Sequence, residues 1–96
     1  MKKKKLTFNG RPVTVSKDSY QNNGTLAVIL TYEDDEDTEV ITVNLNDPLQ
    51  SDSMAYLDIN HYPQIEKWIQ KYNLGLPMGV MQRSGFCQYP LYTLFI

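Results

Sequence analysis

The sequence predicts an α+β fold: a small two-layer sandwich with an antiparallel sheet of four to five strands and one helix at about residues 61–73, followed by a final strand. Three observations support this prediction. Short apolar segments alternate with turn residues through the first half of the chain. One later segment has apolar residues at helical spacing, and residues 86–96 return to an extended apolar pattern.

The length of 96 residues indicates one domain, residues 1–96. Residues 1–5 (MKKKK) are expected to form a basic arm without regular structure. Leu6 and Phe8 then alternate with polar residues, and Asn9-Gly10 is a preferred pair for a type I′ turn. This pattern predicts an N-terminal hairpin.

A second hairpin is predicted in the middle of the chain. Residues 25–33 (TLAVILTYE) are a nearly continuous apolar run rich in β-branched side chains, which is typical of a central strand. Residues 38–45 (TEVITVNL) form its returning partner, and residues 34–37 (DDED) form the turn. Residues 47–53 interrupt the pattern, and residues 54–59 (MAYLDI) are a short strand candidate.

The helix is predicted from one apolar stripe. Four side chains recur at positions i, i+3, i+4 and i+7: Ile65, Trp68, Ile69 and Tyr72. Asn60 is a candidate N-cap, and Asn73 or Gly75 can adopt the left-handed conformation that ends a helix. Residues 77–85 (PMGVMQRSG) are interpreted as a loop before the last strand.

Composition argues against several classes of function. The net charge is −2, but Lys2 to Lys5 supply four of the nine basic residues and leave five against eleven acids, a poor charge balance for binding nucleic acid. One cysteine cannot form an internal disulfide, and with one histidine it cannot build a structural zinc site. No apolar run reaches the ~20 residues of a membrane span. We therefore expect a cytoplasmic protein without a cofactor, nucleic-acid partner or membrane partner.

Six of the eleven acids fall within seven residues at the tip of the second hairpin: Glu33, Asp34, Asp35, Glu36, Asp37 and Glu39. The favoured interpretation is a solvated tip that protects a sheet edge from association. A weak cation site is a second interpretation, although the glycine and terminal glutamate of an EF-hand loop are missing. A third is an acidic patch that imitates nucleic-acid phosphates and inhibits a nucleic-acid enzyme, such as a defence nuclease.

Two side chains are candidate nucleophiles, Cys87 and Ser84. Cys87 with His61, oriented by Asn60 or Asp58, contains the groups of a thiol catalyst, but a cysteine between Phe86 and Gln88 in a strand more often packs as a small apolar residue. Ser84 lacks the flanking glycines of a nucleophile elbow. The sequence therefore predicts a protein that is not an enzyme.

The last strand carries aromatic side chains on both faces and a proline that cannot donate to a sheet. Neither face is polar, so Tyr89-Pro90 is expected to mark a bulge or an edge strand. One face then needs cover from another part of the chain or another molecule. The predicted interaction surface consists of Arg83, Phe86, Tyr89, Tyr92 and Phe95.

The second half of the chain resembles a family of short bacterial proteins known as domain of unknown function 4313. The resemblance is carried by Tyr56, Asp58 and Asn60, by Pro63, Trp68 and Ile69, by Pro77 and Gly79, and by the closing stretch "SGFCQYPLY" at residues 84–92. It implies an accessory or anti-defence role on mobile genetic elements and no defined activity. The recurring polar residues Asp58, Asn60 and Arg83 are the candidate polar site that it suggests.

The resulting expectation is an accessory, non-enzymatic domain that binds an unknown protein, or itself, through the C-terminal aromatic strand. The alternative is an inhibitor that uses the acidic tip at residues 33–39.

Overall fold

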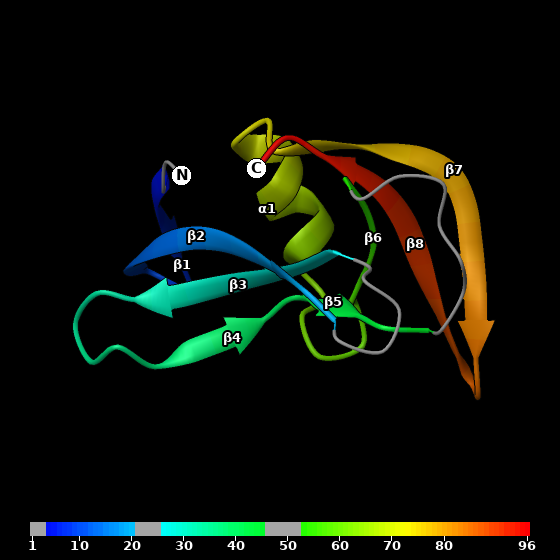
Figure 1. Ribbon diagram of the computed structural model, residues 1–96, viewed down its shortest axis with the longest axis horizontal. Coiled ribbons are helices and arrows are strands. Elements are labelled where there is room, and N and C mark those ends of the chain that lie inside the picture. Colours follow the sequence, from blue (N-terminus) through cyan, green and yellow to red (C-terminus); the bar gives the residue numbers. More distant parts are fainter. Residues whose placement is uncertain (1–3, 21–25, 46–52) are drawn as a thin grey trace.

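The computed structural model describes residues 4–20, 26–45 and 53–96, which form eight strands and one helix (Figure 1). The first antiparallel sheet has the order β1-β2-β3-β4 and contains β1 (Lys4–Phe8), β2 (Arg11–Ser19), β3 (Leu26–Tyr32) and β4 (Thr38–Val40). The second, also antiparallel, has the order β5-β6-β8-β7 and contains β5 (Thr42–Val43), β6 (Met54–Leu57), β7 (Gly75–Ser84) and β8 (Cys87–Leu94). The helix α1 spans Ile65–Lys71.

The predicted α+β sandwich with a single sheet is wrong, because the described residues are mostly β and form two sheets. The strand predicted at residues 38–45 divides at Ile41, where the chain passes from the first sheet to the second. The Ile41 amide donates to the Val28 carbonyl at 3.1 Å, and the Ile41 carbonyl accepts from the Asp58 amide at 2.9 Å. Ile41 is fully buried, so this crossing also lies in the core.

The loop predicted at residues 77–85 is instead most of the longest strand. β7 pairs with β8 through Pro77 opposite Tyr92 and then through Met81 opposite Pro90. Three residues of β7 therefore face one residue of β8, and Gly79 within them has a φ of +76° that favours glycine. The sequence placed the irregularity at Tyr89-Pro90, whereas the extra residues belong to the neighbouring strand.

The helix is shorter than predicted, but its apolar face is confirmed. Ile65, Trp68 and Ile69 are buried, and the chain leaves the helix at Asn73, which has a φ of +55°. Asn60 is not the N-cap of the helix. The N-cap residue is Gln64, and its side chain makes no capping hydrogen bond.

The turns predicted at Asn9-Gly10 and at residues 34–37 are both confirmed. Asn9 and Gly10 have φ values of +54° and +74°, as a type I′ turn requires, and the acidic residues form the turn between β3 and β4. The strand β1 begins at Lys4, so the basic arm predicted for residues 1–5 is interrupted by regular structure. Residues 1–3 and 21–25 lie outside the described residues, as does most of the interruption predicted at residues 47–53.

One core joins both sheets and the helix (Figure 1). Its fully buried side chains come from β1 to β3, the crossing residue Ile41, β6, α1, Leu74 between α1 and β7, and β8. Among the largest are Phe8, Leu30, Ile41, Leu57, Ile65, Ile69, Leu74 and Tyr92. The indole of Trp68 packs edge-on against Phe8 at 5.3 Å between ring centroids, and its Nε1 donates to the Thr7 carbonyl at 2.6 Å. The helix is thereby fixed to the first hairpin as well as to the second sheet.

In the part of the chain that the structure describes, no helix combines the length and apolar character needed to cross a membrane.

Candidate functional site

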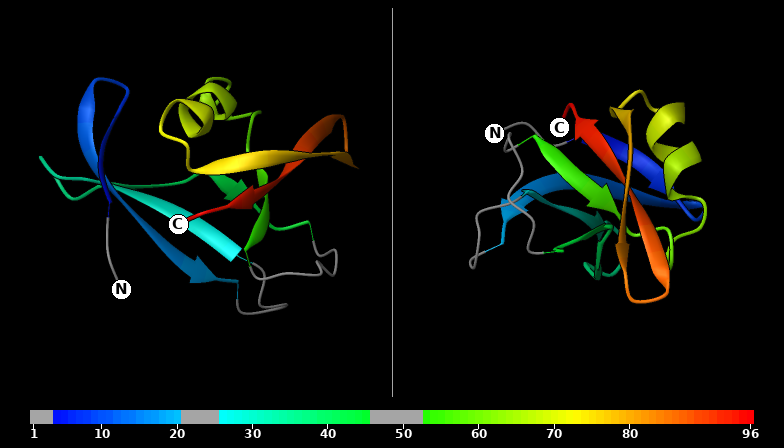
Figure 2. Two further views of the ribbon diagram at one scale, coloured as in Figure 1. Left: turned by 90° about the horizontal axis from the view of Figure 1, so that it is seen from above. Right: turned by 90° about the vertical axis from the view of Figure 1, so that its right-hand side faces the viewer.

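The β7–β8 hairpin exposes a row of apolar side chains on one edge of the second sheet. We call the segment from Gly75 to Gln88 the apolar arm. Its exposed apolar residues are Leu76 (56% exposed), Met78 (42%), Val80 (48%), Met81 (49%) and Phe86 (fully exposed). Figure 2 shows the end of this hairpin extending past the first sheet and the helix. Side chains of this size usually pack inside a small domain, so their exposure makes this hairpin a candidate interaction surface.

The position of β7 explains why these side chains are uncovered. It is the outermost strand of its sheet and pairs with β8 alone. Of its ten residues, only Gly75 at its start is buried. The helix packs where the arm begins: the amide of Leu74 donates to the Ile69 carbonyl, and a side chain added at Gly75 would touch Ile69. Beyond that point β7 is open to solvent on both faces.

The arm also carries very little charge. Between Leu74 and Leu94 the sequence contains one charged residue, Arg83, which is exposed and faces Gln88 on the neighbouring strand. Edge strands in soluble proteins are commonly protected by charged side chains, prolines or bulges. Here Pro77 and the irregular stretch around Gly79 interrupt the strand, but no charged residue lies among the apolar side chains from Leu76 to Met81.

The structure divides the predicted aromatic surface into exposed and buried residues. Arg83 and Phe86 lie on the arm, and Phe95 is 47% exposed after β8 ends. Tyr89 and Tyr92 are buried, so neither ring is open to a partner. The Tyr92 hydroxyl donates to Glu66 Oε1 at 2.8 Å and accepts from Gln70 Nε2 at 3.0 Å, which ties β8 to the helix.

The two apolar faces of β8 are both covered within the chain. Tyr92 and Leu94 belong to the main core. Tyr89 and Leu91 form a second cluster with Tyr56, and Val43, Leu45, Met54 and Cys87 pack around it. The sequence argument for a partner, which rested on an uncovered face of the last strand, therefore does not apply to β8. It applies to β7, its neighbour.

The candidate polar site has one structural and two exposed members. Asp58 is buried, and its carboxylate accepts from the His61 amide at 3.2 Å and contacts His61 Nδ1 at 2.8 Å. Asp58 therefore holds the turn that leads toward the helix. Asn60 is exposed beside Gln88, whose partner across the strands is Arg83. Asn60 and Arg83 are thus each near Gln88, whereas Asp58 is buried and engaged with His61.

Cys87 and His61 have different neighbours. Cys87 lines a shallow pocket of about 240 Å³ with Ile59, Asn60 and Gln88, whereas the His61 ring contacts Asp58 and is largely exposed. Burial and a hydrogen bond to the Cys87 thiol raise the pKa of Tyr89. Within the described ranges, no three His, Cys, Asp or Glu side chains are grouped to hold a metal ion.

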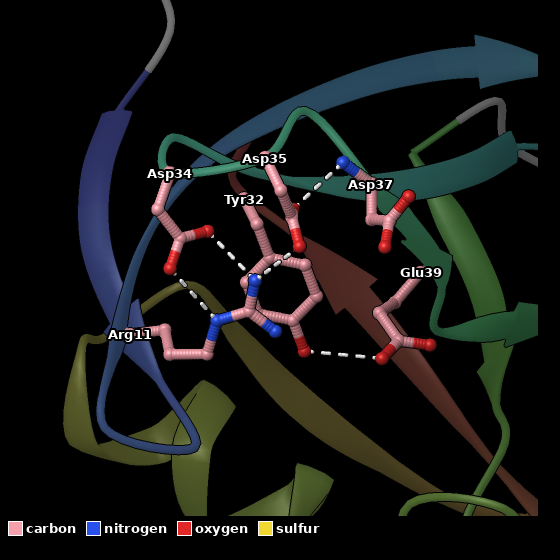
Figure 3. Close-up of polar contacts among 6 residues, drawn as sticks. All are labelled: Arg11, Tyr32, Asp34, Asp35, Asp37 and Glu39. Atoms are coloured by element: carbon pink, nitrogen blue, oxygen red, sulfur yellow. Dashed lines mark hydrogen bonds and ion pairs between the residues drawn. The ribbon is translucent and has the colours of Figure 1, made fainter.

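The acidic tip is partly neutralised by a basic residue from the first hairpin (Figure 3). The Arg11 guanidinium donates through Nη2 to Asp34 Oδ1 at 2.7 Å and through Nε to Asp34 Oδ2 at 3.1 Å. It also donates to Asp35 Oδ2 at 2.8 Å. Its Cζ lies 3.8 Å from the centre of the Tyr32 ring, where a cation is attracted to the aromatic face. The Arg11 guanidinium lowers the pKa of Asp34.

Glu39 is engaged on the other side of Tyr32. The Tyr32 hydroxyl donates to Glu39 Oε2 at 3.0 Å, and the Tyr62 hydroxyl donates to Glu39 Oε1 at 2.8 Å. Of the six acids in this segment, Glu33, Glu36 and Asp37 have exposed side chains outside these contacts. The six acids therefore do not form one continuous acidic surface. Asp34 and Asp35 are paired with Arg11, and Glu39 accepts hydrogen bonds from two tyrosines. Only the other three acids are exposed without these contacts.

Most of the arm was predicted as a loop, because one proline and two glycines lie between positions 75 and 79. A second signal was present. Residues 74–82 contain no charged residue, which is unusual for an exposed loop, and Leu76, Met78, Val80 and Met81 lie within them. The absence of charge together with four large apolar side chains could have identified an exposed apolar strand.

The fold and the arm define a class: a small, mostly β domain with two antiparallel sheets, one short helix and an exposed apolar edge hairpin. More specifically, the model of the family DUF4313, a domain of unknown function, matches residues 14–96, and the chain belongs to this family. Comparison with curated proteins and with solved structures found no match.

Proposed function

We propose that this protein acts by binding another protein chain, without catalysis of its own, and that the apolar arm is the binding surface. The observation that supports the proposal is the exposure of Leu76, Met78, Val80, Met81 and Phe86 on one hairpin. Contact with a partner would remove these side chains from water, and burying apolar surface is the main favourable contribution to protein association.

A protein partner fits this surface better than a nucleic acid does. The arm has a single cation, Arg83, and nucleic-acid binding depends on several positive charges that neutralise phosphates. Polar residues also lie along the arm, with Gln82 and Arg83 between Met81 and Phe86 and Gln88 after them. Protein interfaces commonly combine apolar and polar side chains in this way.

The alternative proposal is that the acidic tip inhibits a nucleic-acid enzyme, and fewer observations support it. Arg11 places a positive charge between Asp34 and Asp35, and Glu39 is occupied by Tyr32 and Tyr62. A surface that imitates phosphates gains from an uninterrupted negative field. The tip and the end of the arm lie at opposite ends of the long axis in Figure 1, so each can be altered without changing the other.

Site-specific photo-crosslinking tests the proposal. The photoreactive residue p-benzoylphenylalanine is placed at Met81 or Phe86 on the arm, in the full chain produced in cells. Control chains carry it at Val40, an exposed apolar position on β4, or at the exposed Lys67 on α1. We expect crosslinked protein products from the arm positions and few from the controls.

Two crosslinking outcomes would contradict the proposal. Equal crosslinking at all four positions, or crosslinks only at the controls, contradicts a binding role for the arm. A further pair of chains carries Glu36→Ser with Asp37→Ser, which removes exposed charge at the tip. The arm crosslinks should persist in these chains, because the tip lies elsewhere; their loss would favour the acidic surface.

A further inference from the structure

We infer that the first hairpin carries a self-modification site. Asn9, which is followed by Gly10, loses its side-chain amide by reaction with the main chain when the turn between β1 and β2 opens. The reaction needs no enzyme and leaves a permanent mark on chains that have opened. This inference is independent of the proposed binding role. It is carried by the residue pair, by the geometry of the turn and by the contacts that hold the turn against the helix.

The pair Asn9-Gly10 contains the groups that the reaction requires, and both residues are exposed to water. The main-chain nitrogen of Gly10 attacks Cγ of Asn9, forms a C–N bond and gives up its proton to water. The bond from Cγ to Nδ2 breaks, Nδ2 takes up a proton and leaves as ammonia, and a succinimide ring remains. Water then opens the ring to aspartate or, at its other carbonyl, to isoaspartate. Glycine permits this attack because it has no Cβ atom to hinder its nitrogen.

The folded turn keeps the reacting atoms apart. Asn9 and Gly10 have φ values of +54° and +74°, and Phe8 pairs with Arg11 on either side of them, as in a two-residue type I′ turn. The first of the two residues in such a turn has a ψ of about +30°. At this angle the next main-chain nitrogen points away from the side chain, whereas ring closure needs both on the same side of the Cα–C bond. The reaction therefore requires the turn to leave its folded conformation.

Contacts with the helix hold the turn closed. Asn9 Oδ1 accepts a hydrogen bond from Gln64 Nε2 at 2.8 Å, and Gln64 is the N-cap residue of α1. Phe8, the neighbour of Asn9, is buried and packs edge-on against Trp68. Opening of the turn must break the link to Gln64 and disturb Phe8 in the core. We therefore expect the open form to be rare in the folded chain.

The two products should differ in their effect on the fold. Aspartate keeps the length of the main chain, its carboxylate can still accept from Gln64, and Asp-Gly is also favoured in type I′ turns. Isoaspartate adds a methylene group to the main chain, because the chain then runs through the former side chain. A two-residue turn that pairs Phe8 with Arg11 cannot contain this extra atom and keep its geometry. Chains modified to isoaspartate should therefore have a loosened first hairpin.

The experiment follows modification of the full chain by peptide mass spectrometry during incubation over days at mildly alkaline pH. One sample is folded and the other is unfolded in urea. We expect Asn9 to react at least about tenfold more slowly in the folded sample, because local opening limits the rate. In urea, Asn23-Gly24, the same pair elsewhere in the sequence, should react at a rate comparable to that of Asn9 and calibrates the chemistry.

Gln64→Ala tests the contact that holds the turn. It removes the hydrogen bond to Asn9 Oδ1, and the helix should persist because the Gln64 side chain makes no capping hydrogen bond. The rate in the folded chain should rise about threefold, as the loss of one ordinary hydrogen bond increases the open population. Lys67→Ala, exposed on the same helix, is the matched control and should leave the rate unchanged. Circular dichroism establishes that both variants are folded.

A second measurement compares the products. Isoaspartyl chains, purified by chromatography, should unfold at a lower temperature than the unaltered chain, whereas Asn9→Asp should unfold close to it. Three results would overturn the inference: equal rates at Asn9 in the folded and unfolded samples, an unchanged rate in Gln64→Ala, or equal stability of the isoaspartyl chain and Asn9→Asp.

Discussion

At the scale of single residues, Glu39 joins two parts of the fold that are distant in sequence. Its carboxyl group accepts hydrogen bonds from Tyr32 in β3 and from Tyr62 in the turn before α1. Both hydroxyls are held in their protonated form: burial first, and then the hydrogen bond to Glu39, raise the pKa of each tyrosine. The link fastens the first sheet to the segment that begins the helix.

Removal of one of these hydroxyls should lower stability measurably. Tyr62→Phe keeps the ring against Phe8 and deletes the 2.8 Å hydrogen bond to Glu39. We expect the free energy of unfolding to fall by about 1 kcal/mol. Urea denaturation followed by the fluorescence of Trp68 measures it.

The control for this change is Tyr72→Phe. The Tyr72 hydroxyl reaches the Thr7 carbonyl at 3.4 Å, a long and weak hydrogen bond. Its loss should have a smaller effect than the loss of the Tyr62 hydroxyl. Equal effects of the two substitutions would argue against a specific role for the link to Glu39.

At the scale of elements, the junction between α1 and the second sheet depends on close approach at Gly75. A Cβ atom at this position would lie 2.6 Å from the Thr93 carbonyl oxygen and 2.6 Å from Leu94 Cδ2. The carbonyl belongs to the neighbouring strand and cannot move without disturbing the pairing of β7 with β8. Glycine is therefore required here for space, at the point where the arm leaves the body of the protein.

Gly75→Ala should destabilise the protein by about 1–3 kcal/mol, the usual cost of forcing an extra carbon into a packed site. Gly79→Ala is the comparison, since no atom lies within 4 Å of a Cβ there but the φ of +76° is unfavourable for alanine. We expect about 1 kcal/mol for that change. Thermal and chemical unfolding of both variants should rank Gly75→Ala as the more damaging; the reverse order would contradict the packing at this junction.

At the scale of the whole molecule, three tyrosines make stability sensitive to alkaline pH. Burial, followed by hydrogen bonds to Glu39 or Glu66, raises the pKa of Tyr32, Tyr62 and Tyr92 above the ordinary value of about 10. Above that pH the unfolded chain loses phenolic protons that the folded chain retains. Their contribution to stability is therefore complete below about pH 10 and declines as the pH rises toward the folded-state values.

Denaturation curves between about pH 8 and about pH 11 should show this decline. Tyr62→Phe should flatten it, because one of the three titrating hydroxyls is removed. Stability that stays constant or increases above about pH 10 would show that these hydroxyls do not retain their protons in the folded chain.

Much of the local structure could be predicted from the sequence. The Asn9-Gly10 turn, the acidic turn between β3 and β4, and the buried face of Ile65, Trp68 and Ile69 all follow from contacts within a few residues. For these features, turn preference and apolar spacing are sufficient information. Membership of the family also followed from short motifs in the second half of the chain and is confirmed over residues 14–96.

The candidate site was less accessible to sequence reasoning. Arg83 and Phe86 are exposed, but on a β7–β8 hairpin where the sequence predicted a loop and then a strand. Tyr89 and Tyr92 are buried by contacts with β6 and α1 that no local pattern predicts. The acidic tip was found as a run of residues. Its partial neutralisation was not, because Arg11 reaches it from a different hairpin.

The turns, the helix face, the low charge of the arm and the family thus follow from the order of the residues alone. Long-range contacts were needed to establish that the strands form two sheets, that the chain crosses between them at Ile41, and that β7 lies at an open edge. The difference lies in the range of the interactions. Turn conformation and helix periodicity depend on neighbouring residues, whereas the position of a strand in a sheet depends on pairing and burial between segments far apart in the chain.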